Sequence, residues 1–408
     1  MKKRRKKDNL FQLIHIIVVL CAAGILAVIV LGDKENNKSA LPGDTAEEQS
    51  ADIVIRNTET EKIEGKTAAF YIDEVNHFEL PVQGATGYAA VDISLFGEKE
   101  VPDSEKGKVL AGEGFTILRE EGDWWYIRFG EQEGWVKHEY CMINLPDILP
   151  SIIYFNDNAT ASMLRSSGEK IPNITGEVLY ESFTYTGRYE MEQYIMPVLY
   201  SMAPKIAKAQ LLAREDGNTL IIYETYRPYE VQRKIVDNFS ALVQSNQKVS
   251  DGVNQAPWSI GWFIATRLSN HQRGVAMDVS LGKVIEEEMV ICGDYKYYGV
   301  LEYDEYIMPT PMHELSAAAV TFRSGVSSAS KTEWKNCELS DTMNEPAILL
   351  QNYCTNAELT PLASEWWHFN DLDSKERIAD TQIGGQYYIS ENYSVEPVSA
   401  EEGEKAEE

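Results

Sequence analysis

The chain has 408 residues, with 64 acidic and 37 basic side chains and a formal net charge of −27. This excess of negative charge argues against a nucleic-acid partner, because binding phosphate requires a basic surface. Hydrophobic residues make up 44% of the chain and aromatic residues 10%, which is enough to build folded cores and argues against a disordered protein. A chain of this length is expected to form roughly two or three folded units.

The N-terminus has the pattern of a single membrane anchor. Residues 1–10 form a basic segment with six consecutive lysines and arginines, and residues 11–32 contain no acidic residue, lysine or arginine. At about 1.5 Å per residue, this second stretch spans roughly 33 Å as a helix, about the thickness of the hydrocarbon core. A cleaved signal peptide or a buried core helix is the alternative, but residues 28–32 lack a small-residue cleavage site. We expect residues 1–10 to stay in the cytoplasm, residues 11–32 to span the membrane and the chain after Asp33 to lie outside the cell.

The next segments are a predicted linker and a predicted small β domain. Residues 33–66 are rich in Glu, Asp, Asn, Ser and Thr, which predicts a flexible linker. Residues 67–144 change to short strands separated by turns. Within residues 124–129, Trp125, Ile127 and Phe129 alternate with the intervening residues at a period of two, as a half-buried strand requires.

The order of these strands carries a resemblance. A strand, a turn, the Trp-Trp-Tyr-Ile strand of residues 124–127, a second turn and the Gly-Trp-Val of residues 134–136 follow one another. This order resembles a bacterial Src-homology-3-like barrel. In cell-wall enzymes such modules commonly bind the wall, so the resemblance implies binding to a cell-wall polymer. The alternative is a spacer whose tryptophans only form its core.

Residues 145–393 are predicted to form one α+β domain. Apolar residues recur at helical spacing before Gly217, which is placed to end that helix; they are Leu199, Met202, Ile206 and Ala209. Residues 220–223 form a short apolar run that indicates a buried strand, and a second amphipathic helix is expected over residues 231–242. Strands and helices without a regular βαβ repeat favour α+β over a doubly wound sheet. Residues 394–408 are predicted to be an acidic, disordered tail.

Four cysteines lie beyond the predicted anchor, where disulfides could form: Cys141, Cys292, Cys337 and Cys354. Cys337 could pair with either Cys292 or Cys354, and the connectivity cannot be read from the sequence. The chain contains no C-x-x-C motif, so a cysteine-ligated zinc site is not expected.

Three short segments of the α+β domain contain the residue types of a hydrolytic zinc site. Such a site needs three protein ligands and an open position for water, and His271, Asp278 and His368 offer two imidazoles and one carboxylate. Glu365, three residues before His368, could take a proton from the attacking water. A fixed guanidinium such as that of Arg227 could offset the negative charge of the tetrahedral intermediate. Each residue alone also has a structural explanation, so the hypothesis depends on their combination.

The combination resembles one enzyme family. The pattern S-x-H-x-x-x-x-x-x-D of residues 269–278 is followed, about ninety residues later, by the Glu-Trp-Trp-His of residues 365–368. The Y-R-P-x-x-x-Q of residues 226–232 precedes both. Together they resemble the zinc D-alanyl-D-alanine dipeptidases and carboxypeptidases of the VanX and VanY type, over about residues 145–393. The resemblance implies Zn²⁺ bound by His271, Asp278 and His368, with Glu365 as general base, Arg227 at the oxyanion, and Ser269 and Gln232 as peptide contacts.

The sequence departs from this family at two places. Residues 282–306 look like an insertion after Asp278. In the dipeptidases, a run comparable to residues 308–314 carries an Asp that receives the free amino group of the substrate, and here His313 takes that place with Glu314 beside it. His313 is therefore a candidate substrate contact, and strict dipeptide specificity is in doubt.

The resemblance and the anchor together predict a membrane-anchored, extracytoplasmic zinc D-alanyl-D-alanine carboxypeptidase that acts on peptidoglycan stem peptides. A D-alanyl-D-alanine dipeptidase, or a peptidase that cuts elsewhere in the stem peptide, is the alternative within the same chemistry. A protein that only binds the cell wall is the alternative of another class. Loss of Glu365 or of a zinc ligand would have favoured that last alternative, and all four residues are present.

Overall fold

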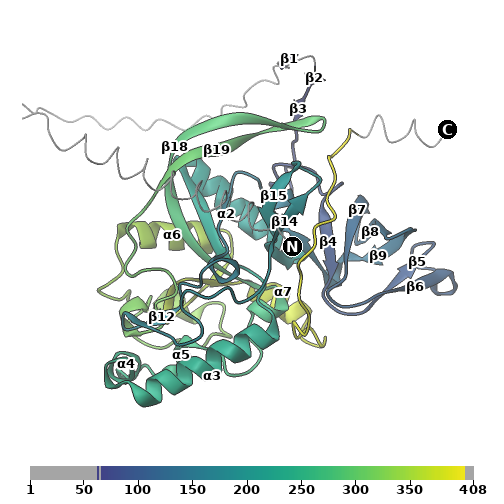
Figure 1. The fold of residues 1–408 in the computed structure, drawn as a ribbon. Coiled ribbons are helices and arrows are strands. Elements are labelled where there is room, and N and C mark those ends of the chain that lie inside the picture. Colours follow the sequence, from purple (N-terminus) through teal and green to yellow (C-terminus); the bar gives the residue numbers. More distant parts are fainter. Residues whose placement is uncertain (1–61, 64–65, 400–408) are drawn as a thin grey trace, which may run out of the picture. The chain divides into compact units, whose positions relative to one another are not determined.

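The computed structural model describes residues 62–63 and 66–399, which belong to one compact unit of the chain (Figure 1). The predicted cytoplasmic segment 1–10 and membrane anchor 11–32 lie outside the described residues. Within the described part we find no helix with the length and hydropathy of a membrane span.

The first sheet has eight strands, and seven of them come from residues 86–144. In spatial order the strands are β16-β10-β4-β7-β8-β9-β5-β6. A short 3-10 helix, η2 (His138–Tyr140), lies between β9 and β10. The strand bounds are β4 (Thr86–Ala89), β5 (Ile93–Phe96), β6 (Glu105–Val109), β7 (Gly114–Glu121), β8 (Trp124–Phe129), β9 (Gln132–Lys137), β10 (Cys141–Asn144) and β16 (Pro197–Leu199).

The side chains of β8 show why this strand forms. Trp125 and Ile127 are fully buried, whereas Arg128 is exposed, which is the alternation expected from the sequence. Trp124 departs from it, because its ring is also buried and lies 5.9 Å from that of Phe96. The strand is therefore covered on part of its second face as well.

The second sheet carries the rest of the fold. Its main path is β11-β17-β18-β19-β3, and β21 joins β18 and β20. The β11–β17 and β19–β3 pairs are parallel and the others are antiparallel. The bounds are β3 (Ala69–Phe70), β11 (Ile153–Tyr154), β17 (Asn218–Glu224), β18 (Ala276–Cys292), β19 (Tyr295–Glu305), β20 (Thr360–Leu362) and β21 (Glu365–Asn370).

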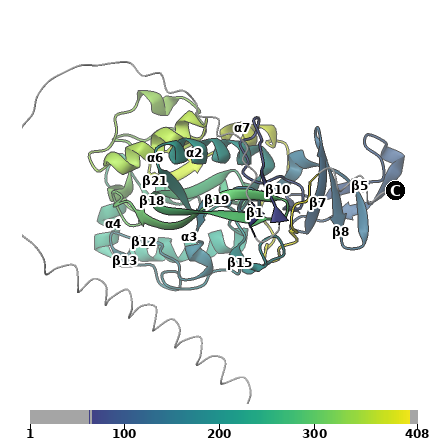
Figure 2. The ribbon, with the colours of Figure 1, turned by 90° about the horizontal axis from the view of Figure 1, so that it is seen from above.

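Helices cover this sheet. In Figure 2, α2 (Ala203–Glu215) and α6 (Glu345–Asn356) lie on one side of the sheet, and α3 (Tyr229–Ser245) and α4 (Gln247–Val253) lie on the other. The apolar stripe expected on α3 is buried, with Phe239 fully enclosed. A mixed sheet between helices is the α+β arrangement predicted from the sequence.

The remaining elements are short. Two of them, β1 and β2, form a small hairpin in the last residues of the predicted flexible linker 33–66, whose other residues lie outside the described part. The bounds are β1 (Lys62–Ile63), β2 (Lys66–Thr67), β12 (Arg165–Ser166), β13 (Glu169–Lys170), β14 (Phe183–Thr186), β15 (Met191–Tyr194), α5 (Ile260–Phe263), α7 (Leu372–Arg377), η1 (Pro102–Ser104), η3 (Leu145–Asp147), η4 (Asp157–Ala159), η5 (Tyr200–Met202), η6 (His271–Arg273), η7 (Ala317–Ala319) and η8 (Glu333–Asn336).

The helix expected from Leu199 onward starts later than predicted. Leu199 ends β16, Met202 lies in η5, and α2 begins at Ala203 with Pro204 in its first turn. Proline fits the first turn of a helix, where its missing N–H is not needed. Leu199 and Met202 are both buried, so their apolar spacing reflects burial in other elements and not one continuous helix.

The predicted boundary at residue 144 does not separate two independent sheets. β16, from the predicted α+β range 145–393, pairs with β10 of the first sheet. β3, from the predicted barrel range, pairs with β19 of the second sheet. Each addition pairs the backbone of a strand that would otherwise be a sheet edge. The two parts therefore share strands.

The predicted disordered tail 394–408 is wrong for its first residues. The hydroxyls of Ser394 and Thr186 lie 2.6 Å apart, and the Val395 N–H donates to the Gly84 carbonyl at 2.8 Å. The Ser399 N–H donates to the Asp294 carboxylate at 2.7 Å. The backbone of residues 394–399 is thus tied to the folded unit, and composition alone did not indicate these contacts. Residues 400–408 lie outside the described part.

The expected insertion, residues 282–306, is most of a long β-hairpin formed by β18 and β19 (Figure 1). Neither disulfide allowed by the sequence forms, because all four described cysteines are free. Cys292 lies near the tip of the hairpin, where its thiol faces the Arg188 carbonyl at 3.4 Å. Cys337 contacts the Glu333 carbonyl at 3.6 Å.

Candidate metal centre and active site

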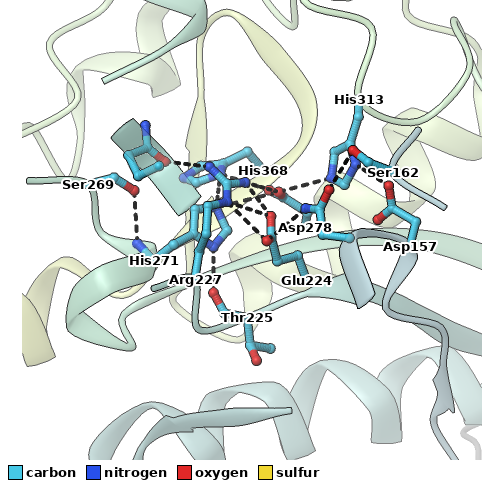
Figure 3. Close-up of polar contacts among 12 residues, drawn as sticks. Asp157, Ser162, Glu224, Thr225, Arg227, Ser269, His271, Asp278, His313 and His368 are labelled. Atoms are coloured by element: carbon cyan, nitrogen blue, oxygen red, sulfur yellow. Dashed lines mark hydrogen bonds and ion pairs between the residues drawn. The ribbon is translucent and has the colours of Figure 1, made fainter. Parts of the chain in front are cut away.

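Three strands of the second sheet place their side chains in one row. Asp278 of β18 is directly opposite Glu224 on β17 and His368 on β21. Residues paired across neighbouring strands project from the same face of a sheet. The three side chains therefore lie side by side (Figure 3).

His271 reaches this row from η6. Gly274 ends that turn with a φ of 68°, a conformation that glycine adopts without strain, and the chain then enters β18. The Nδ1 of His271 donates to the Thr225 carbonyl at 2.5 Å. Its Nε2 consequently faces the row, 3.4 Å from Asp278 Oδ2 and 3.2 Å from His368 Nδ1.

His368 is oriented in the same way through its other nitrogen. Its Nε2 lies 3.0 Å from the Asn370 side-chain oxygen, and its Nδ1 lies 2.8 Å from Asp278 Oδ1. Each imidazole thus gives one ring nitrogen to a protein oxygen and presents the other to the site, which is the usual support of a metal-ligating histidine.

The donor set fits zinc. One ligand atom from each of His271, Asp278 and His368 lies within 4.8 Å of the others, and all three residues are buried. Two imidazoles and one carboxylate with room for water are the ligands of a catalytic zinc site. Burial alone would raise the pKa of Asp278, but the imidazoles around it hold that pKa well below its ordinary value. The carboxylate is therefore ionised, as a metal ligand must be.

Glu365 lies beside these ligands at the start of β21. Its Oε2 is 3.9 Å from His368 Nδ1. The register between β20 and β21 shifts between Pro361 and Leu362, and such irregularities often re-aim a side chain near an active site. Burial raises the pKa of Glu365 to about 7 although His368 is close. A carboxylate with this pKa can exchange a proton near neutral pH.

Arg227 is held by an acid that the sequence analysis did not single out. Its Nε lies 3.0 Å from both carboxylate oxygens of Glu224, and its Nη1 donates to Gln232 Oε1 at 2.7 Å. Its Nη2 is 3.7 Å from Asp278 Oδ2. Burial opposes the charge of Arg227, yet Glu224 keeps its pKa above the ordinary value. The guanidinium is thus charged and fixed beside the candidate ligands.

Gln232 and Ser269 were both expected to touch the peptide. Both polar atoms of the Gln232 amide already have a protein partner, since its oxygen accepts from Arg227 and its nitrogen donates to the Ala265 carbonyl at 2.9 Å. The structure therefore favours a role for Gln232 in positioning Arg227. The Ser269 hydroxyl accepts from the His271 N–H at 3.1 Å and lines the cavity, so its own O–H remains available.

His313 contacts acids of the protein at the place where we expected a substrate contact. Its Nδ1 lies 3.1 Å from Asp157 Oδ2 and its Nε2 lies 3.2 Å from Asp278 Oδ2 (Figure 3). Glu314 turns away from the site and accepts hydrogen bonds from the backbone N–H groups of Ser167 and Gly168. Neither residue thus offers a free carboxylate to a substrate.

Glu224 and Asp157 are the residues that the sequence analysis missed. Glu224 follows a buried apolar run and precedes Arg227 by three residues, and a buried acid at that place was a usable signal. Asp157 lies in η4 outside every motif, so no sequence signal pointed to it. Glu224, Asp278 and His313 also bring ligand atoms within 4.8 Å of one another. Arg227 on the Glu224 carboxylate opposes a second cation there.

These residues line one cavity of about 210 Å³. The candidate ligands, Glu365, Arg227 and Ser269 belong to its polar part. Its apolar part includes Phe263, Leu315 and Trp367. The cavity is large enough for the end of a peptide, and it brings together the features of a hydrolytic metal site.

The family model described as D-Ala-D-Ala dipeptidase, a peptidase family, matches residues 173–386, more than half of the chain. The chain belongs to this family. It is a zinc metallopeptidase. The matched residues of this peptidase contain every candidate site residue expected from the sequence.

Comparison with other proteins adds little to the family match. No curated protein matches the peptidase. Among solved structures, it is similar to a zinc-bound mutant of the vancomycin resistance D,D-pentapeptidase VanY from a VanB-type resistance cassette. The identity is 14%, the match covers 54% of this chain and 93% of that chain, and the TM-score is 0.21. A likeness this remote carries no argument about the reaction.

Proposed function

We propose that this peptidase is a D,D-carboxypeptidase that removes the terminal D-alanine from peptidoglycan stem peptides. The observation that carries the proposal is one cavity whose buried lining side chains include two imidazoles, a carboxylate and a further acid. In this proposal His271, Asp278 and His368 bind zinc. The chemistry that zinc supplies in such a site is polarisation of the scissile carbonyl and activation of water.

The other side chains then have distinct tasks. Glu365 accepts the proton of the attacking water and delivers it to the leaving amine, for which a pKa of about 7 is suited. Arg227 faces the oxygen that becomes negative in the tetrahedral intermediate, and Glu224 and Gln232 fix its guanidinium beforehand. The hydroxyl of Ser269 contacts the peptide.

A stem peptide suits the site better than free D-alanyl-D-alanine. The free dipeptide carries an ammonium group, and burying that group without an acidic partner costs on the order of a few kcal/mol. His313 lies between Asp157 and Asp278, and Glu314 is used by the backbone of residues 167–168. A longer peptide has a neutral amide at the same place and avoids this cost.

The test compares free D-alanyl-D-alanine with a pentapeptide that ends in the same two residues. The purified, zinc-loaded enzyme should show the higher kcat/KM on the pentapeptide. If kcat/KM for the free dipeptide is instead about tenfold higher than for the pentapeptide, the enzyme is a dipeptidase. Such a ratio corresponds to a difference of about 1.4 kcal/mol in activation free energy between the two substrates.

We also propose that residues 11–32 anchor the enzyme in the cell membrane and that the peptidase faces outward. Six basic residues before an apolar stretch support this orientation. A reporter that is active only outside the cytoplasm, fused after Glu408, should be active. Activity of a cytoplasmic reporter at the same site would contradict the orientation.

For residues 67–144 we propose a Src-homology-3-like barrel that binds a cell-wall polymer. The strand order β10-β4-β7-β8-β9, with the short helix η2 before β10, supports the barrel. Its wall-binding role is supported only by the enzyme's proposed substrate. The enzyme should sediment with purified peptidoglycan, and substitution of exposed side chains of this sheet, such as Arg128→Ala and Lys137→Ala, should reduce sedimentation while peptidase activity is kept.

A further inference from the structure

One lysine that lines the active-site cavity has no acidic partner. Lys375 of α7 is half-buried and lines the same cavity as the candidate zinc ligands. Among residues 66–399, no carboxylate lies within 4 Å of its ammonium group. A charged group that is partly removed from water and lacks a counter-ion is poised to bind an anion.

The acids of the same helix are already used by other lysines. Lys205 binds Asp371 at 2.8 Å and Asp373 at 2.6 Å. Lys331 binds Asp373 at 2.5 Å and Glu376 at 2.6 Å. The cavity lysine is thus unpaired even though its helix and the preceding residue carry three acids.

A second cation lies close to it. Arg273 of η6 has no ion pair within 4 Å in the described part of the chain. Burial lowers the pKa of Lys375, and the positive charge of Arg273 lowers it further. Two neighbouring cations without an ion pair, one of which lines the cavity, are unexpected in a chain with a net charge of −27. Two neighbouring positive charges favour the binding of a negatively charged ligand.

The guanidinium of Arg227, which also lines the cavity, is not equivalent to the ammonium group of Lys375. The charge of Arg227 is offset by the Glu224 carboxylate, with both oxygens 3.0 Å from Nε. Among the described residues that line the cavity, Lys375 is therefore the only lysine or arginine without an acidic partner. An anionic group of a substrate has one uncompensated cation to meet there.

The chain also fixes where this cation lies relative to the zinc ligands. His368 is near the end of β21, and α7 follows directly through its N-cap, Asp371, whose carboxylate accepts from the N–H groups of Asp373 and Ser374. Seven residues along, Lys375 returns to the same cavity. The candidate zinc ligand His368 and the cation Lys375 thus lie on consecutive elements, a strand and a helix that Asp371 caps.

We propose that Lys375, with Arg273 near it, binds the free α-carboxylate of the terminal D-alanine. This inference rests on the proposed carboxypeptidase function and names the group that recognises the end of the chain. In the substrate, only one carbon separates that carboxylate from the scissile nitrogen, so both must occupy the same cavity. An internal peptide bond has no such carboxylate. The ammonium group therefore selects for removal of the last residue.

The test uses two acyl-D-alanyl-D-alanine peptides that differ only in a terminal carboxylate or a terminal amide. With the zinc-loaded full-length enzyme, Lys375→Gln should lower kcat/KM for the acid about 10- to 100-fold, as expected for a lost charge-assisted hydrogen bond. The same variant should leave kcat/KM for the amide unchanged. Lys375→Arg should restore most of the preference for the acid. Lys331→Gln is the matched control, since Lys331 lies outside the cavity residues and should change neither value.

The outcomes separate this inference from the proposed function. If the wild-type enzyme cleaves neither peptide, the proposed function fails and the inference fails with it. If the wild-type enzyme cleaves the acid but Lys375→Gln keeps the wild-type ratio of acid to amide, the inference alone fails. An equal loss on both peptides would assign Lys375 to packing and would also overturn it. The same ratio measured as binding affinity on zinc-loaded Glu365→Gln enzyme gives a readout without turnover.

Discussion

At the scale of single residues, the site separates groups that hold the metal from a group that moves a proton. The two imidazoles and Asp278 converge on one point, and their remaining atoms are hydrogen-bonded to Thr225, Asn370 and His313. Glu365 lies next to them, with its nearest oxygen 3.9 Å from His368 Nδ1. The three candidate ligands and Glu365 should therefore respond differently to substitution.

We expect zinc binding and turnover to respond differently to substitution. His271→Ala, Asp278→Ala and His368→Ala should each lower bound zinc and activity together, because each removes one of three ligands. Glu365→Gln should keep zinc and lower kcat by several orders of magnitude. Metal analysis of the purified variants and single-turnover kinetics measure the two effects. Full zinc loading in a double variant of His271 and His368 would contradict the assignment of the ligands.

Arg227 should contribute to both catalysis and stability. Arg227→Ala is expected to lower kcat by roughly 10²–10³, the usual effect of losing one oxyanion partner. It should also lower the free energy of unfolding by about 3–5 kcal/mol, because Glu224 keeps a buried charge without a partner. The double variant with Glu224→Gln should recover much of the stability and none of the kcat. An increase in KM alone, with kcat unchanged, would show that Arg227 only binds substrate.

At the scale of elements, the C-terminal segment is part of the fold. Residues 394–399 bind the loop at Gly84 and the turn between β18 and β19. Glycine is required at that turn, because a Cβ on Gly293 would lie 2.1 Å from the Pro397 carbonyl oxygen, and its φ is 57°. The long hairpin and the C-terminal segment thus fit against each other.

Deleting residues 394–408 should therefore destabilise the enzyme, whereas deleting residues 401–408 should not. The longer deletion removes the contacts of Ser394, Val395 and Ser399, and each hydrogen bond contributes about 1 kcal/mol. We expect a loss of about 2–3 kcal/mol in the free energy of unfolding, measured by denaturant titration. Equal stability of the two truncated chains would mean that the segment only rests on the surface.

At the scale of the whole described unit, the first sheet and the peptidase sheet are joined through shared strands and a common core. β16 pairs with β10, and the rings of Trp125 and Tyr200 have centroids 4.6 Å apart. The Tyr200 hydroxyl donates to Glu120 Oε2 at 3.0 Å. A wall-binding barrel on a flexible tether would lack these contacts.

The two sheets are accordingly expected to unfold together. Calorimetry of the purified enzyme should give one transition for residues 66–399, with equal calorimetric and van't Hoff enthalpies. The intrinsic tryptophan fluorescence, to which Trp125 of the first sheet contributes, and the loss of peptidase activity should have the same midpoint. Two separated transitions would show that residues 67–144 form an independent domain, as the sequence alone suggested.

The sequence by itself determined the chemistry and the elements whose apolar pattern is local. The motifs that contain His271, Asp278, Glu365 and His368 resemble a zinc peptidase family, and the family match confirmed the enzyme class. The buried strand β17 and the amphipathic helix α3 were also predicted, because a hydrophobic period of two or 3.6 residues depends only on neighbouring positions.

The tertiary structure alone decided what depends on contacts between distant residues. It placed Glu224 on Arg227 and enclosed the Gln232 amide, and it inserted His313 between two acids. It joined the first sheet to the peptidase range through β16 and fixed residues 394–399. Lys375 could be proposed as a substrate-binding residue only from the structure, because the structure places it at the cavity and pairs the neighbouring acids Asp371 and Glu376 with other lysines. Pairing partners far apart in the chain leave no periodic signal, so only the folded arrangement identifies them.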